Sequence, residues 1–111
     1  GKETIFCERV NKKFTLRRGF LIKKNSRVLI VEDVITTGKS SLECFKLIKK
    51  CKAKLVGFAC LIDRSDKTKI KQKIISQIKL KIPTYNMKNL PSFLKNKPVI
   101  KPGSRFLKWL N

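Results

Sequence analysis

Two adjacent acids followed by a run of hydroxyl residues form the segment of this sequence best suited to chemistry. Glu32 and Asp33 follow the apolar residues 28–31, and a turn containing Gly38 then leads into a helical pattern. Backbone N–H groups in such a turn, together with the positive end of the helix dipole, favour a phosphate group, and neighbouring carboxylates can accept hydrogen bonds from sugar hydroxyls. We therefore predict a sugar-phosphate site made of Glu32, Asp33, Val34, Ile35, Thr36, Thr37, Gly38, Lys39 and Ser40.

Two other interpretations of this segment compete with that prediction. A Walker A loop has the same ending, Gly38-Lys39-Ser40, but it requires a glycine five positions before Gly38, where this chain has Asp33. An ordinary strand–turn–helix junction would also place acids at a strand end and a serine at a helix start. The thirteen-residue pattern over residues 28–40 is more specific than either feature, and it favours the sugar phosphate.

The predicted site lies between two apolar runs that are typical of buried strands. Residues 27–31 and 55–62 contain few polar side chains, which favours strands buried on both faces of a parallel sheet. The intervening helix has an apolar stripe formed by Leu42, Phe45, Leu47 and Ile48. Ser40 or Ser41 is expected to cap this helix, with Glu43 in its first turn. Strand, helix and strand together predict an α/β fold with a parallel sheet.

Shorter elements are predicted on either side of this unit. A strand is expected over residues 3–7, and a weak helix interrupted by Pro91 is expected over residues 86–97. Residues 74–82 could be helix or strand, and the alternation of Ile78, Leu80 and Ile82 favours a strand. Residues 8–26 are basic with few apolar positions and are predicted to form a mobile loop, although residues 14–16 could be one arm of a hairpin. Nothing marks a second domain, so residues 1–111 are interpreted as one domain.

The charge of the chain is strongly positive, with 28 Lys+Arg against 7 Asp+Glu and a net charge of +21. Such a balance is typical of proteins that bind nucleic acid or an anionic membrane. The basic residues are mostly Lys spread along the whole chain, and Arg, the better phosphate reader, is scarce. We therefore attribute the charge to solvated faces and attraction of anionic substrates, and expect neither nucleic acid nor a membrane as partner. No apolar run approaches the roughly 20 residues of a membrane span.

The four cysteines, Cys7, Cys44, Cys51 and Cys60, do not form a metal-binding pattern. None belongs to a C-x-x-C pair, and the chain has no His that could complete a zinc site. Cys60 lies inside an apolar run and is predicted to be part of the core. The pattern indicates reduced thiols in a cytosolic protein.

The segment over residues 28–40 closely resembles the phosphoribosyl-pyrophosphate (PRPP) loop of type I phosphoribosyltransferases. Both have a hydrophobic strand, two acids, two apolar residues and then Thr-x-Gly-x-Ser/Thr. Further short pieces resemble one bacterial branch of the orotate phosphoribosyltransferases: residues 5–9, 14–20, 61–64, 82–85 and 101–105. The resemblance covers nearly the whole chain in order and implies a Rossmann-like, parallel-sheet core.

The resemblance also implies a reaction. Orotate phosphoribosyltransferases join orotate to PRPP with Mg²⁺, giving orotidine 5′-monophosphate and pyrophosphate in pyrimidine biosynthesis. They are expected to be cytoplasmic homodimers. The PRPP segment would cradle the 5′-phosphate and ribose, Thr36 would also face orotate, and Arg64 would pair with the orotate carboxylate. Alternatively, Asp63 and Arg64 could form a plain salt bridge at the end of a strand.

The basic loop matches the mobile catalytic loop of the same family. Cations that close over a departing pyrophosphate would stabilise an oxocarbenium-like transition state. The catalytic candidates carried over are Arg9, Lys12, Lys13 and Asp33, with Arg17 and Arg18 as further candidates. A solvated basic loop without such a role is the alternative.

The N-terminal half of the family has no counterpart in this sequence. The chain starts with Gly1, and the expected strand over residues 3–7 follows at once. We therefore expect a partial domain that is inactive or weak alone, with exposed sheet edges and uncovered apolar surface. Two rival functions remain open: a phosphoribosyltransferase for a purine or uracil, and a PRPP-sensing regulator that binds nucleic acid.

Overall fold

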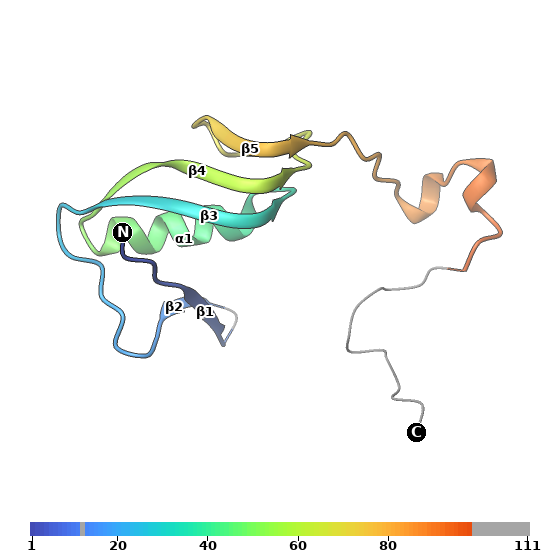
Figure 1. Ribbon diagram of the computed structural model, residues 1–111. Helices are drawn as coiled ribbons and strands as arrows, with labels where there is room; N and C mark the ends of the chain where they lie inside the picture. The colour runs from blue at the N-terminus through green and yellow to red at the C-terminus, as the bar shows by residue number, and fades with distance from the viewer. Residues whose placement is uncertain (12, 99–111) are drawn as a thin grey trace, which may run out of the picture.

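A β-α-β unit forms the centre of the computed structural model, which describes residues 1–11 and 13–98 (Figure 1). Strand β3 (Arg27–Ile35) leads into helix α1 (Lys39–Lys50), and strand β4 (Lys54–Asp63) follows. β3 and β4 pair in parallel, from Arg27 opposite Lys54 to Ile35 opposite Asp63. The predicted parallel α/β arrangement is therefore confirmed.

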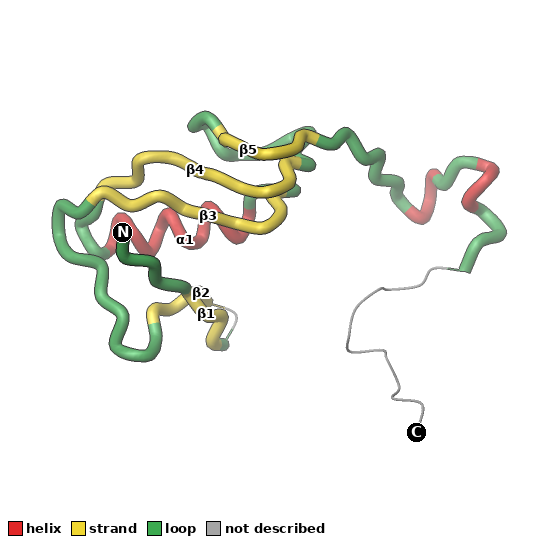
Figure 2. Tube along the Cα trace, viewed as in Figure 1, coloured by secondary structure: helices red, strands yellow, loops and turns green. Residues whose placement is uncertain are grey.

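A third strand completes the sheet. β5 (Ile74–Lys79) pairs in parallel with β4, and the strand order is β3-β4-β5 (Figure 2). The strand predicted over residues 74–82 is thus present, but it ends at Lys79 rather than at residue 82. The chain leaves the sheet before Pro83, which has no N–H for a sheet ladder.

The core lies between α1 and one face of the sheet. Its buried side chains are Ile30, Ile35, Ile48, Phe58, Cys60 and Ile70. The opposite face has no helix on it among the described residues (Figure 1), and Val31, Leu61 and Ile75 there are 71%, 61% and 63% exposed. The prediction that the strands are buried on both faces is therefore wrong, whereas the expected uncovered apolar surface is present.

The N-terminal region forms a hairpin beside α1. β1 (Cys7–Val10) pairs antiparallel with β2 (Lys13–Leu16), and Asn11 adopts a positive φ of 46° in the connection. Asn tolerates that conformation better than most residues. The strand predicted over residues 3–7 is therefore displaced, because it begins only at Cys7. The suggested hairpin arm at residues 14–16 is confirmed.

The C-terminal region of the described chain contains two short 3₁₀ turns, η1 (Met87–Asn89) and η2 (Ser92–Leu94). The weak helix predicted over residues 86–97 is therefore wrong. Pro91 separates the turns, and Leu90 before it is extended, as the proline ring requires of the preceding residue. Residues 101–105, which carried part of the family resemblance, lie outside the described residues. No helix in the described part of the chain is long and apolar enough to cross a membrane.

Candidate functional site

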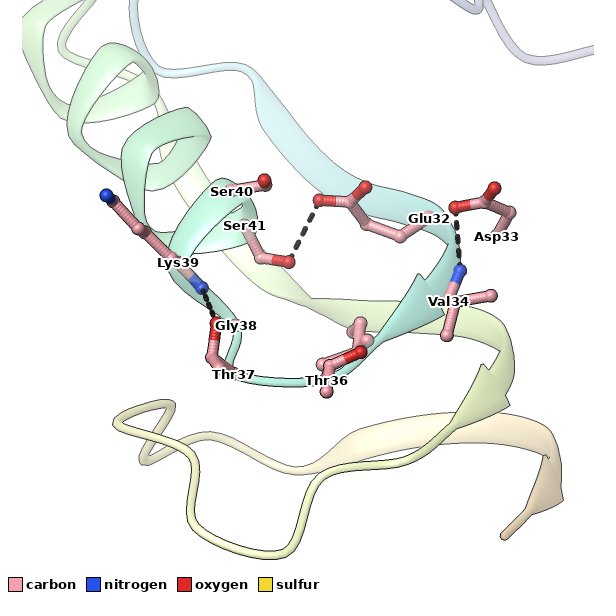
Figure 3. Close-up of a pocket in the computed structure, with 10 residues that line it drawn as sticks. Glu32, Asp33, Val34, Thr36, Thr37, Gly38, Lys39, Ser40 and Ser41 are labelled. Atoms are coloured by element: carbon pink, nitrogen blue, oxygen red, sulfur yellow. Dashed lines mark hydrogen bonds between the residues drawn. The ribbon is translucent and has the colours of Figure 1, made fainter. Parts of the chain in front are cut away.

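The two acids of the predicted site lie within β3 rather than after it. The apolar run predicts a strand that ends at Val31, but the strand continues to Ile35 because pairing with β4 extends to Asp63. Successive side chains of a strand point to opposite faces, so only Glu32 of the two acids faces α1. One oxygen of Asp33 accepts a hydrogen bond from the N–H of Val34 at 2.7 Å (Figure 3).

Helix α1 begins without a side-chain cap. Its N-cap is Gly38, with φ 72°, which makes no side-chain cap bond, and the N–H of Lys39 donates to the Thr37 hydroxyl oxygen at 3.4 Å (Figure 3). The predicted cap at Ser40 or Ser41 is therefore wrong, because the helix already starts at Lys39. Glu43 consequently lies beyond the first turn. The N–H groups of Ser40 and Ser41 have no partner within the helix, which leaves them available to an anion.

Ser41 has a different function from the predicted cap. Its side chain is only 2% exposed, and its hydroxyl donates a hydrogen bond to Glu32 Oε1 at 2.9 Å (Figure 3). This bond holds the Glu32 carboxylate at the start of the helix. Sequence reasoning missed Ser41 as a site residue, although it belongs to the hydroxyl run that indicated the site.

A second loop packs against the turn at Gly38. The Thr68 hydroxyl donates to the carbonyl of Thr37 at 3.3 Å and accepts from the N–H of Ile70 at 3.1 Å. A Cβ atom at Gly38 would lie 2.6 Å from Thr68 Oγ1 and 2.7 Å from Ile70 Cδ1. Thr68 therefore supports the turn from a position far along the chain. No local sequence signal marks it, because residues 67–73 have only the pattern of a polar connection.

These residues enclose a pocket of about 260 Å³ at the end of β3. Its lining is Glu32, Asp33, Val34, Ile35, Thr36, Thr37, Gly38, Lys39, Ser40 and Ser41 (Figure 3). All nine residues predicted for the sugar-phosphate site are thus brought to one pocket, with Ser41 added. Carboxylates, hydroxyls and helix amides in one polar pocket suit a ligand that has both a phosphate and sugar hydroxyls.

Arg64 lies beside this pocket, directly after β4. The backbone N–H of Arg64 donates to the carbonyl of Ile35 at 2.8 Å, which places Arg64 next to the end of β3. Its Nε atom is buried and has no hydrogen-bond partner in the part of the chain that the structure describes. The strand-end salt bridge between Asp63 and Arg64 does not form; within the described residues Asp63 instead lies 3.9 Å from Lys79 Nζ. Arg64 therefore keeps hydrogen-bonding capacity for a ligand.

Asp63 is a structural acid. It is 4% exposed and accepts hydrogen bonds from the N–H and hydroxyl of Ser65 at 2.8 Å and 2.5 Å. Burial alone would raise the pKa of Asp63, but the two Ser65 hydrogen bonds and nearby Lys79 outweigh burial and hold that pKa below its ordinary value. The carboxylate is thus kept ionised and fixes the turn that presents Arg64.

Of the basic residues predicted for catalysis, Arg9 and Lys13 are not brought into the pocket. Arg9 forms a salt bridge with Glu43 of α1 at 2.8 Å and lies 4.3 Å from the ring centroid of Phe14. Lys13 is exposed at the start of β2, and Lys12 lies outside the described residues. The further candidates Arg17 and Arg18 pair with Glu8 at 2.9 Å and 3.3 Å.

Comparison with known proteins connects this geometry to a family. Residues 4–90 match the family described as "Phosphoribosyl transferase domain". The chain is 48% identical over 104 residues to an orotate phosphoribosyltransferase of Parvibaculum lavamentivorans, covering 93% of this chain and 54% of that protein. It is 44% identical over 108 residues to an orotate phosphoribosyltransferase of Maricaulis maris, covering 96% of this chain and 56% of that protein. The chain thus spans about half the length of these curated relatives. Because the family match covers most of the chain, including the whole pocket, the chain belongs to the phosphoribosyl transferase domain family.

Proposed function

We propose that this chain supplies the PRPP-binding part of an orotate phosphoribosyltransferase. One observation carries the proposal: residues 32–41, which include two acids, line one pocket at a helix N-terminus that has no side-chain cap. The similarity to two orotate phosphoribosyltransferases supports the choice of enzyme. The whole reaction would convert orotate and PRPP to orotidine 5′-monophosphate and pyrophosphate.

The 5′-phosphate of PRPP would bind at the start of α1. Amides of the first helical turn and the hydroxyls of Thr36, Thr37 and Ser40 can donate to its oxygens, and the helix dipole favours its negative charge. Glu32 and Asp33 would accept hydrogen bonds from the ribose hydroxyls. Because Ser41 already occupies one oxygen of Glu32, the carboxylate is oriented before the ligand arrives.

Mg²⁺ is expected to accompany PRPP rather than to occupy a cage of protein ligands. It commonly binds through one or two carboxylates together with substrate phosphates and water. Glu32 and Asp33 fit that pattern, and the described residues contain no group of three or more metal-binding side chains. The ion would neutralise charge on the pyrophosphate group.

Arg64 is the candidate for binding orotate, together with Thr36. A guanidinium group recognises a planar carboxylate through paired hydrogen bonds. The buried Nε of Arg64 has no partner among the described residues, so a ligand carboxylate would satisfy a donor that burial otherwise leaves unpaired.

Residues 8–26 would act as the catalytic loop, with Arg9, Lys12 and Lys13 as candidate cations and Asp33 as an acid of the site. Arg9 is bound to Glu43 here, so its participation requires that this salt bridge opens. The leaving pyrophosphate is highly charged, and cations that close over it would lower the barrier. The full-length enzyme is proposed to be a cytoplasmic homodimer.

Calorimetric titration of the chain with PRPP and Mg²⁺ tests the pocket. We expect binding that Asp33→Asn weakens by at least about tenfold, since hydrogen bonds to charged groups contribute about 1.5–3 kcal/mol. Asp66→Asn is the matched control, because Asp66 is exposed and outside the pocket. A chain that is folded by circular dichroism and does not bind PRPP would contradict the proposal.

Product formation in the full-length protein tests the substrate. Orotate should be converted, whereas uracil, adenine and hypoxanthine should not. Arg64→Lys should raise the KM for orotate and leave PRPP affinity unchanged, because a single ammonium cannot reproduce the paired hydrogen bonds of guanidinium. Equal use of a purine base would instead indicate a different phosphoribosyltransferase.

A further inference from the structure

A second and larger hollow lies along α1, outside the pocket at the end of β3. Its volume is about 770 Å³, which is within the usual range of small-molecule sites. Three segments border it: the turn before α1, the helix itself and the loop that follows β4. We call this hollow the lysine groove, because five of its lining residues are Lys39, Lys46, Lys49, Lys67 and Lys69.

The floor of the lysine groove is apolar. Leu42 and Phe45 of α1 pack against the core but are only partly buried, and both line the groove. The methylene stems of the lysines add further apolar surface. Lys49 Nζ lies 4.8 Å from the centroid of the Phe45 ring, a cation–π contact that holds one ammonium group at this floor. The groove therefore offers apolar surface and positive charge side by side.

The positive charge of the groove has no balancing acid. None of the five lysines forms a salt bridge with a described residue. Glu43, the one acid in the lining, already forms a salt bridge with Arg9 at 2.8 Å. Lys39 lines both hollows, but its side chain points away from Glu32 of the other pocket (Figure 3). The charge of the groove thus matches a ligand with several negative charges.

We propose that the lysine groove binds a nucleoside triphosphate, with the base against Leu42 and Phe45 and the phosphates at the lysines. This inference goes beyond the proposed function and does not depend on it. An inorganic anion would leave the apolar floor in water, and an uncharged ligand would leave the ammonium groups without a counter-charge. The volume is that of a site for one small molecule, which favours a free nucleotide over a nucleic-acid strand.

Calorimetric titration of the chain with ATP, without Mg²⁺, tests the lysines. The double substitution Lys46→Gln and Lys49→Gln should weaken ATP binding by at least about tenfold, because contacts between charged groups and phosphate are strong. Lys23→Gln with Lys24→Gln is the matched control. Both of these lysines are exposed and line neither hollow, and the control has the same net charge. Equal weakening by the two double substitutions would assign the binding to net charge and refute the proposal.

A comparison of ligands tests the apolar floor. Inorganic triphosphate should bind more weakly than ATP, because it has no base to cover Leu42 and Phe45. Binding of inorganic triphosphate as tight as that of ATP would contradict the proposal. Tighter binding of a short single-stranded RNA at the same lysines would also contradict it, since the groove would then belong to a nucleic-acid surface.

The Asp33→Asn variant separates the two hollows. Asp33 lines only the pocket at the end of β3, so the substitution should weaken PRPP binding and leave ATP binding intact. Weaker ATP binding in this variant would place ATP in that pocket instead of the groove.

Lysine acetylation by an active ester locates the ligand directly. ATP should slow the acetylation of Lys46 and Lys49 but not that of Lys23 and Lys24, as measured by peptide mass spectrometry. Equal protection of all four lysines, or protection of none, would overturn the proposal.

Discussion

At the scale of single residues, Gly38 meets two constraints that no other residue type satisfies together. Its φ of 72° is in the left-handed region, and a Cβ there would meet Thr68 and Ile70 at less than 3 Å. The first constraint is a property of the backbone, whereas the second comes from a distant loop. The tightness of the turn beneath the proposed phosphate site therefore depends on both.

Substitution of two glycines separates these constraints. Gly19 has φ 73°, but no atom lies within 4 Å of the position that a Cβ would take, so Gly19→Ala should cost only the backbone term of about 1–2 kcal/mol. Gly38→Ala should lower the free energy of unfolding by a further 1–3 kcal/mol or so, as overpacking does. Urea denaturation of both variants measures the difference. An equal loss of unfolding free energy in the two variants would show that Thr68 and Ile70 move away from a Cβ at position 38 without cost.

At the scale of elements, the end of β4 depends on an ionised Asp63. Because the folded-state pKa lies below the ordinary value of 3.8, the carboxylate stabilises the fold above about that pH. This stabilisation is lost as the pH falls through the folded-state pKa. The turn that presents Arg64 should accordingly loosen in acid.

Ser65→Ala tests this dependence. The substitution removes the hydroxyl donor to Asp63 and should lower the free energy of unfolding by about 1–2 kcal/mol at neutral pH. The difference from the unsubstituted chain should shrink as the pH falls below 3.8 and through the folded-state pKa of Asp63, because a protonated carboxyl group is a weaker acceptor for the Ser65 hydroxyl of the unsubstituted chain. Urea denaturation across the acid range measures it. A difference that does not change with pH would assign the loss to packing rather than to charge.

At the scale of the whole molecule, one face of the sheet is apolar and uncovered. Val31, Leu61 and Ile75 lie on β3, β4 and β5 and are more than half exposed. Contiguous apolar surface of this kind favours association in water. The net charge of +21 opposes it, because like charges repel.

We expect the chain to self-associate through this face, and increasingly so as salt screens the charge. Leu61→Lys should reduce association by placing a charge at the centre of the face. Leu21→Lys is the control, since Leu21 is 80% exposed but lies outside the sheet. Sedimentation velocity at low and high salt measures both. Equal reduction by the two substitutions would indicate an effect of net charge alone.

Much of the central unit was predictable because its signals are local. The apolar runs over residues 27–31 and 55–62 identified two strands, and the stripe on α1 identified the helix between them. The pocket is contiguous in sequence, so all its lining residues except Ser41 could be named before their geometry was known. Local pattern determines such a site because strand, turn and helix follow one another directly.

Other features depended on contacts between distant residues. A run of apolar residues indicates that a strand tends to be buried, but it does not say which element buries it. Among the described residues, α1 covers only one face of the sheet. The Ser41 bond to Glu32, the support of Gly38 by Thr68, and the salt bridge between Arg9 and Glu43 each join separate parts of the chain. The sequence by itself determined the β-α-β order and nine of the ten residues that line the pocket. Only the tertiary structure decided which side chains orient that pocket and where the hairpin lies, because those depend on how the elements pack.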